Sequence, residues 1–278
     1  MTILDSLALA IVGLFTGVLA GFLGIGGGTV LVPILVALGA RPVEAVATSS
    51  LAIIVTSLSG SIQNWRMGLL SFQSVFFLGL PALLTAQFGV LLADELPARV
   101  LLVAFGLLLL MNVYLVEWRK HVTRQALRAS QAASHTECRE VSGTTNAIAS
   151  SEASATWNPI AARIFTGGIS GFMAGLFGIG GGVIMVPLQI LLLNETIKTA
   201  IQTSLGTIVL TALSSTIGHA LKGNVLWMTG LLLGMGGFIG AQISTRLLPR
   251  LPDRLVSVLF RALLLLLAAY IFYQAWAY

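Results

Sequence analysis

Charged residues are scarce in this chain. Lys, Arg, Asp and Glu together make up 9% of its 278 residues, whereas an average soluble domain carries about 25%. Hydrophobic residues make up 56%, and several uninterrupted apolar runs reach the roughly 20 residues that a helix needs to cross the hydrocarbon core. The sequence therefore predicts an all-α integral membrane protein that passes through the lipid bilayer several times.

Cysteine and histidine are also rare. The single cysteine, Cys138, excludes an intramolecular disulfide and a metal site built from several cysteines. The sequence contains no G-x-S-x-G, no H-E-x-x-H and no pair of carboxylates within an apolar run. We therefore expect no metal, no cofactor and no enzymatic activity.

The few charges lie outside the middle of the apolar runs. No run has Asp or Glu in its middle, although carriers of cations usually keep such carboxylates within the membrane. Of the 15 basic residues, five lie between Arg119 and Arg139 and most of the others border apolar runs, as membrane topology requires. The net charge of +5 thus does not indicate a nucleic-acid partner.

Glycine, by contrast, is abundant and forms a block that occurs twice. Residues 17–34 read GVLAGFLGIGGGTVLVPI and residues 171–188 read GFMAGLFGIGGGVIMVPL, with identity at ten positions at an offset of 154. The match continues past the glycine block, with Ser49-Ser50-Leu51 over Thr203-Ser204-Leu205 and, after one inserted residue, Leu96-Pro97 over Leu251-Pro252. The sequence therefore predicts two homologous repeats, residues 1–118 and 159–278, joined by a polar linker over 119–158.

Each repeat contains five apolar segments, and the first two of them form one unit around the glycines. A continuous helix over residues 6–38 would be about 50 Å long, too long for one crossing of a ~30 Å core and too short for two. We therefore expect a glycine-broken helical hairpin followed by three spanning helices in each repeat. The predicted segments are 4–23, 29–39, 45–63, 69–92 and 98–117, and then 160–177, 183–193, 199–219, 225–247 and 254–276.

Basic residues favour opposite orientations for the two repeats. With a cytoplasmic linker and both termini outside, eleven basic residues lie inside and three outside. With an even number of crossings in each repeat and both termini inside, the division is eight to six. The excess of Lys and Arg in cytoplasmic loops therefore favours inverted repeats with periplasmic termini.

The glycine blocks are the leading candidates for a binding site. Consecutive N–H groups freed from a helix form a nest for anions, and the start of the next helix adds partial positive charge. Paired glycine breaks in two halves also point to a transport site. The candidate residues are Gly24, Gly26, Gly27 and Gly28 in the first repeat and Gly178, Gly180, Gly181 and Gly182 in the second, with Pro33 and Pro187 as hinges or helix breaks.

Other small and polar residues have two interpretations each. The leading glycines, Gly13/Gly17/Gly21 and Gly167/Gly171/Gly175, fit close helix packing better than a site. The hydroxyls of Ser49, Ser50, Thr203 and Ser204 either bond to their own helix or face a cavity beside the glycines. Gln87 and Gln242 favour interhelical hydrogen bonds, and His219 is either an interface residue or a group for proton coupling.

The two copies of G-x-x-A-G-x-x-G-I-G-G-G-x-x-x-V-P, each opening one half of the chain, resemble the sulfite exporter TauE/SafE family of membrane permeases. The resemblance covers essentially the whole chain except the linker. It implies a permease of the bacterial inner membrane that moves sulfite, sulfonates or related organic anions. It also implies that Gly24–Gly28 with Pro33, and Gly178–Gly182 with Pro187, belong to the transport site.

The sequence thus predicts a secondary transporter for a small anion that works by alternating access, with the two glycine breaks meeting near the midplane. One alternative is a permease for a cationic or neutral solute on the same scaffold. Another is a membrane accessory protein without transport activity. The sequence leaves the particular anion, the direction of transport, the coupling ion and the oligomeric state open.

Overall fold

The computed structural model describes residues 3–112, 114 and 158–277, and these residues form helices without β-strands. In the first half, α1 (Ile3–Leu23) and α2 (Gly28–Ala37) precede α3 (Pro42–Arg66), α4 (Phe72–Glu95) and a helix over Ala98–Asn112. The predicted all-α fold and the hairpin of α1 and α2 are confirmed. Most of the predicted linker, including Cys138, lies outside the described residues.

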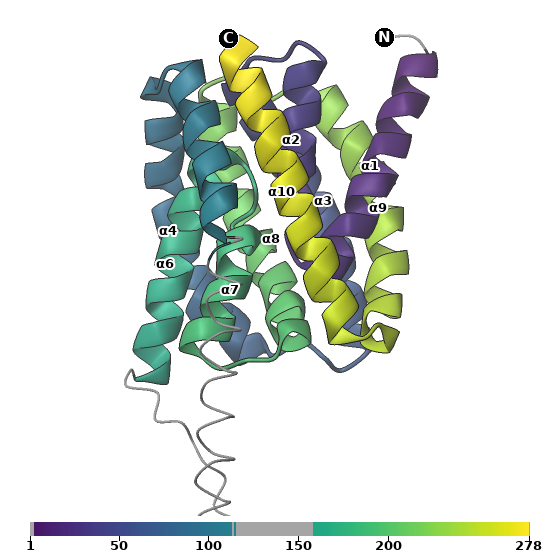
Figure 1. Ribbon diagram of the computed structural model, residues 1–278, viewed down its shortest axis with the longest axis vertical. Helices are drawn as coiled ribbons and strands as arrows, with labels where there is room; N and C mark the ends of the chain where they lie inside the picture. Colours follow the sequence, from purple (N-terminus) through teal and green to yellow (C-terminus); the bar gives the residue numbers. More distant parts are fainter. Residues whose placement is uncertain (1–2, 113, 115–157, 278) are drawn as a thin grey trace, which may run out of the picture.

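The second half has the same order of helices. It consists of α6 (Pro159–Phe177), α7 (Gly182–Leu192), α8 (Ile197–Leu221), α9 (Trp227–Leu247), the 3₁₀ turn η1 (Leu248–Arg250) and α10 (Asp253–Ala277). Seven helices of the described chain are long and apolar enough to cross a membrane. The two termini lie at one end of the bundle and α6 begins at the other end (Figure 1). The first helices of the two halves therefore run in opposite directions.

Glycines end the first helix of each half. Gly24 and Gly178 adopt left-handed φ values of 66° and 64°, which end α1 and α6, and their N–H groups cap the carbonyls of Ala20 and Ala174. The chain then turns and starts the short helices α2 and α7. Pro33 and Pro187 lie inside these short helices, which continue through them. The visible break in each half is therefore at the glycines, and each proline removes one helical N–H donor from the short helix that follows.

The two halves are interleaved, because the first helix of each half packs on the fourth helix of the other. A Cβ built on Gly17 of α1 would lie 2.3 Å from the Gly237 carbonyl oxygen of α9, and one on Gly171 of α6 would lie 2.1 Å from the Ala82 oxygen of α4. Figure 1 shows α1 beside α9 and α4 beside α6. The packing role predicted for the leading glycines is thereby confirmed, since only residues without a side chain allow this approach.

Two glycines of α6 provide a matched test of this packing. Gly171→Ala places a methyl group against the α4 backbone, so we expect a loss of about 1–3 kcal/mol in stability, as for other overpacked sites. At Gly168 the nearest atom to a built Cβ is 3.9 Å away. Gly168→Ala should therefore leave stability unchanged or raise it through helix propensity. Thermal unfolding of the purified protein in detergent measures both; equal melting temperatures for the two variants would contradict the packing role.

Candidate functional site

The two glycine turns, residues 24–28 and 178–182, lie directly against each other. A Cβ built on Gly28 would lie 2.5 Å from the Gly178 carbonyl oxygen, and one on Gly182 would lie 2.2 Å from the Gly24 oxygen. All ten residues are buried. The sequence prediction placed these turns together, and the structure brings them into backbone contact.

Two serine hydroxyls cross between the halves to these turns. Ser49 of α3 donates to the Gly178 carbonyl oxygen at 2.7 Å, and Ser204 of α8 donates to the Gly24 oxygen at 2.9 Å. Each hydroxyl also has an acceptor in its own helix, Val46 O at 2.9 Å for Ser49 and Ile201 O at 2.8 Å for Ser204. A hydroxyl carries one proton for these two acceptors, so each serine can release the glycine carbonyl without losing its own hydrogen bond.

This reciprocal pair corrects the predicted register between α3 and α8. The sequence match paired Ser49 with Thr203 and Ser50 with Ser204 at an offset of 154. In the structure α3 and α8 begin and end at residues that differ by 155, and Ser49 corresponds to Ser204. The additional residue of the second half lies at the end of α7 and in the turn that follows it. It therefore precedes α8 and shifts the whole of that helix.

The remaining predicted hydroxyls, those of Ser50 and Thr203, do not donate to the glycine turns. Ser50 bonds to Val46 O at 2.9 Å and meets Ser215 Oγ of α8 at 3.1 Å, which joins the two central helices. Thr203 is buried in α8, where its carbonyl accepts a hydrogen bond from Thr207. Among the four predicted hydroxyls, those of Ser49 and Ser204 are therefore the ones that the structure places on the glycine turns.

Backbone donors in both turns lack acceptors. The N–H groups of Ile25, Gly26 and Gly27, and those of Ile179, Gly180 and Gly181, donate to no other group in the described part of the chain. Gly26 and Gly27, and Gly180 and Gly181, have positive φ values, so the chain turns sharply there, and successive N–H groups of such a turn can bind an anion. Each unpaired buried donor costs about 1–3 kcal/mol, so an acceptor that reaches these N–H groups would stabilise the turn.

One further hydroxyl belongs to the first turn. Thr29 is fully buried and its Oγ1 has no partner among the described residues. The matching residue in the second half is Val183. The two turns therefore differ chemically: the first carries the unpartnered Thr29 hydroxyl, whereas at the second the Thr211 hydroxyl donates to the Gly180 carbonyl oxygen at 2.9 Å.

Two isoleucines cover the turns in this conformation. A Cβ built on Gly26 would meet Ile53 Cγ2 at 3.0 Å and Ile208 Cγ2 at 3.1 Å, and one on Gly180 would meet the same two methyl groups at 3.2 and 2.7 Å. Ile53 and Ile208 occupy matching positions of α3 and α8. The turns are thus closed off by side chains at the contact between these helices.

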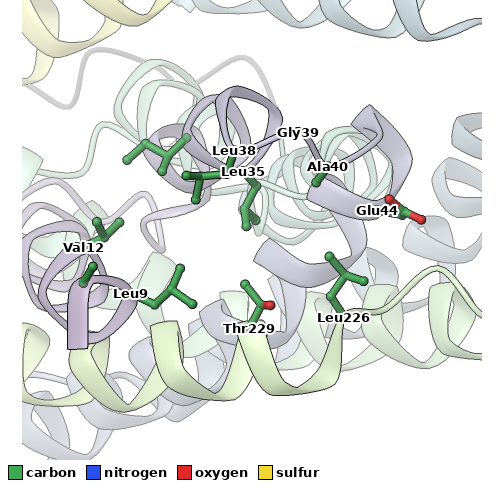
Figure 2. A pocket seen from close by; sticks show the side chains of 11 residues that line it. Leu9, Val12, Leu35, Leu38, Gly39, Ala40, Glu44, Leu226 and Thr229 are labelled. Carbon is green, nitrogen blue, oxygen red and sulfur yellow. The ribbon is translucent and has the colours of Figure 1, made fainter. Parts of the chain in front are cut away.

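A pocket of about 560 Å³ lies at the end of the bundle that carries the termini. Figure 2 shows Leu9 and Val12 on one side, Leu35 and Leu38 above, and Leu226 and Thr229 of the α9 segment opposite. Its size is typical of ligand pockets, and its lining is mostly apolar, with Glu44 at the edge. The glycine turns do not line it. They lie about 10 Å further along α2, at 1.5 Å per residue.

Other predicted positions fall at helix contacts. A ring nitrogen of buried His219 lies 3.2 Å from the Gly175 carbonyl oxygen of α6, near the turn at Gly178. Gln87 Nε2 donates to the Ser214 carbonyl at 2.7 Å, and Gln242 Nε2 to the Ser59 carbonyl at 3.4 Å. The predicted interhelical role of the two glutamines is confirmed.

Sequence reasoning missed Thr29, the two isoleucines and the apolar pocket. Ile53 and Ile208 recur at matching positions, so the repeat carried a signal for them once the offset of 155 is known. Thr29 differs between the repeats and therefore gave no such signal. The pocket depends on α9 lying beside α1, which the order of segments along the chain does not determine.

Comparisons with known proteins agree on the class of the molecule. The family model described as "Sulfite exporter TauE/SafE" matches residues 9–271. The chain is similar to the probable membrane transporter protein YunE of Bacillus subtilis, with 27% identity over 96% of this chain and 97% of the relative. It is also similar to a probable membrane transporter protein of Xylella fastidiosa strain Temecula1, with 28% identity over 95% and 94%.

A more distant relative comes from an archaeon. The probable membrane transporter protein MJ0441 of Methanocaldococcus jannaschii is 24% identical over 76% of this chain and 71% of its own length. No solved structure gives a significant match. The printed names of these relatives state membrane transport and specify no solute.

Proposed function

The chain belongs to the sulfite exporter TauE/SafE family of membrane transporters, and on that premise we propose that it carries small anions, such as sulfite or organosulfonates, by alternating access. The observation that supports an anion is the set of unpaired N–H groups from Ile25 to Gly27 and from Ile179 to Gly181. Anion oxygens are acceptors that complete such donors. Both turns also start a helix, whose N-terminal end attracts negative charge.

In this mechanism the binding residues are those of the two turns and the serines that contact them. Gly24, Gly26, Gly27 and Gly28 with Thr29 form one side, and Gly178, Gly180, Gly181 and Gly182 form the other. Ser49 and Ser204 hold the Gly178 and Gly24 carbonyls while the site is closed. When they turn back to their own helices, the turns separate and the N–H groups become accessible to the anion.

The positions of the carboxylates also favour an anion over a cation at the glycine turns. The carboxylates of Glu44 and Asp94 lie at helix ends and pair with Arg41 and Lys222, at 2.7 and 2.9 Å. A cation would therefore find no carboxylate beside the turns among the described residues. His219 remains our candidate for proton coupling, because its buried ring contacts α6 close to the second turn.

Helix packing suggests which parts move. Ser59 of α3 donates to the Phe238 carbonyl of α9, and Ser214 of α8 donates to the Leu83 carbonyl of α4, each at 2.7 Å. Together with the glycine contacts of α1 and α6, these bonds define one body of α1, α3 and α9 and another of α4, α6 and α8. We propose that these mixed bodies rock against each other along the α3–α8 contact, instead of one sequence half moving against the other. From the distribution of basic residues, we also propose that the linker faces the cytoplasm and that both termini face the opposite side.

The glycine assignment is tested by uptake of radiolabelled sulfite into proteoliposomes. Gly26→Ala places a methyl group in the turn, where φ is 74°, whereas Gly68→Ala has nearly the same φ of 71° and no atom within 4 Å of its Cβ. The two variants share the backbone strain and differ only at the site. We expect Gly26→Ala to reduce uptake about tenfold or more, the effect of losing roughly 1.4 kcal/mol of binding, and Gly68→Ala to retain it.

Wild-type flux separates the proposed function from its alternatives. Saturable uptake of sulfite or an organosulfonate is required by an anion carrier. Saturable uptake of a cation or neutral solute alone would identify the other type of permease, and no uptake of either kind would favour an accessory protein. Equal uptake by wild type and Gly26→Ala would refute the role of the turns.

The moving bodies are tested by cross-linking in a Cys138→Ser background. Ser50→Cys with Ser215→Cys joins α3 to α8, where the native hydroxyls are 3.1 Å apart. Thr56→Cys with Gly237→Cys joins α3 to α9 within one body, since a Cβ on Gly237 would lie 3.3 Å from the Thr56 Cβ. Oxidation should stop uptake for the first pair, with recovery on reduction, and should leave the second pair active. Continued uptake by the fully cross-linked first pair would contradict the proposed movement.

A further inference from the structure

The residues that line the apolar pocket at the termini end correspond to a largely polar set of residues at the opposite end of the bundle. Three of the lining residues match polar residues at an offset of 154. At 155, after the residue inserted at the end of α7, Ala40, Leu226 and Thr229 do so as well, besides Gly39 and Glu44. In the order of the chain, Leu9, Val12, Leu35, Ala40, Leu226 and Thr229 correspond to Arg163, Thr166, Gln189, Glu195, Ser71 and Ser74. Because α6 begins at the opposite end of the bundle from α1, this polar cluster lies at the end where α6 begins, which we call the linker end (Figure 1).

The end of α7 positions two members of the cluster. The N–H groups of Leu193 and Glu195 both donate to the Gln189 carbonyl, and Asn194 between them adopts a left-handed φ of 52°. This turn brings the Glu195 carboxylate back over α7. With the Gln189 amide oriented to donate, its nitrogen lies 3.0 Å from Glu195 Oε2 and 3.3 Å from the Ala200 carbonyl oxygen.

The α6 side of the cluster holds donors without acceptors. Thr166 is fully buried and its hydroxyl has no partner in the described chain, and the Nε of Arg163 is buried and equally without one. These residues are three apart on α6 and therefore lie on one face. Burial raises the pKa of the Glu195 carboxyl, and the positive charge of the Arg163 guanidinium opposes that shift. The two side chains therefore interact electrostatically.

We propose that Arg163 and Thr166, beside Gln189 and Glu195, form a second anion site at the linker end, which holds the solute on its way to or from the glycine turns. This inference rests on the proposed function. An anion oxygen accepts from the Arg163 guanidinium and the Thr166 hydroxyl, which complete their hydrogen bonds in this way. Glu195 competes with the anion for the positive charge of Arg163. The matching pocket at the termini end lacks an arginine, so the two ends of the pathway differ in their affinity for anions.

Sulfite transport measured from each face of the protein tests this site. In proteoliposomes of known orientation, we expect Arg163→Gln to raise the KM for sulfite at the linker face about tenfold or more and to leave the KM at the termini face unchanged. Arg163→Lys should restore part of the affinity, because it keeps the charge and loses the planar guanidinium. Glu195→Gln should lower the linker-face KM, since it removes the competing carboxylate. Arg41→Gln, at an exposed arginine of the opposite end, serves as the control.

A binding measurement keeps this inference separable from the proposed function. Sulfite-dependent thermal stabilisation of the purified protein requires no transport; it should be weaker in Arg163→Gln and stronger in Glu195→Gln than in wild type. If wild type shows this pattern of binding but no flux, the proposed function fails and the site stands. If both variants merely lower the melting temperature and leave the sulfite response and both KM values unchanged, Arg163 and Glu195 form a structural pair and the site is refuted.

Discussion

The structure depends on one reciprocal contact, in which a serine of each half holds the broken helix of the other. Ser49 bonds the carbonyl that ends α6, and Ser204 bonds the carbonyl that ends α1. A helix broken inside a membrane leaves polar backbone groups that lipid cannot satisfy, so the break has to be covered by protein. Here the two breaks cover each other, with Ile53 and Ile208 above them. The central position of the turns and the interleaving of the two halves both follow from this requirement.

The contact satisfies the carbonyls of the turns and leaves their N–H groups unpaired. That imbalance connects the architecture to the proposed anion transport, because the missing partners are acceptors. Each serine has a second acceptor in its own helix, Val46 O for Ser49 and Ile201 O for Ser204. The two turns can therefore separate without leaving a serine hydroxyl unpaired. In the proposed mechanism, opening exchanges a contact between the two turns for hydrogen bonds to the solute. The cost of burying unpaired donors in the closed state, about 1–3 kcal/mol for each, favours whichever state supplies an acceptor.

Sequence reasoning reached the helical class, the two glycine-broken hairpins and the packing role of Gly17 and Gly171, because glycine spacing and apolar length follow directly from backbone geometry. It failed where the outcome depends on which helices meet. The extra residue at the end of α7 shifts α8 by one position. Identical residues occur at both offsets, Ser50-Leu51 over Ser204-Leu205 at 154 and Thr48-Ser49 over Thr203-Ser204 at 155, so Ser49 was matched to Thr203 instead of Ser204. The pocket beside Leu9 requires α9 to cross to the first half, which a repeat alone does not reveal. The contrast between Leu9 and Arg163 was present in the sequence, yet it gained meaning only when both positions were placed at opposite ends of the bundle.

Hydrogen–deuterium exchange of the full-length protein with and without saturating sulfite tests the central claim most directly. If the free N–H groups bind the anion, sulfite will slow exchange in the peptides that span residues 24–31 and 178–185, and it will leave the turns at Gly68 and Gly223 unaffected. Unchanged exchange in both glycine turns, under conditions in which sulfite transport is saturated, would show that the anion is bound elsewhere.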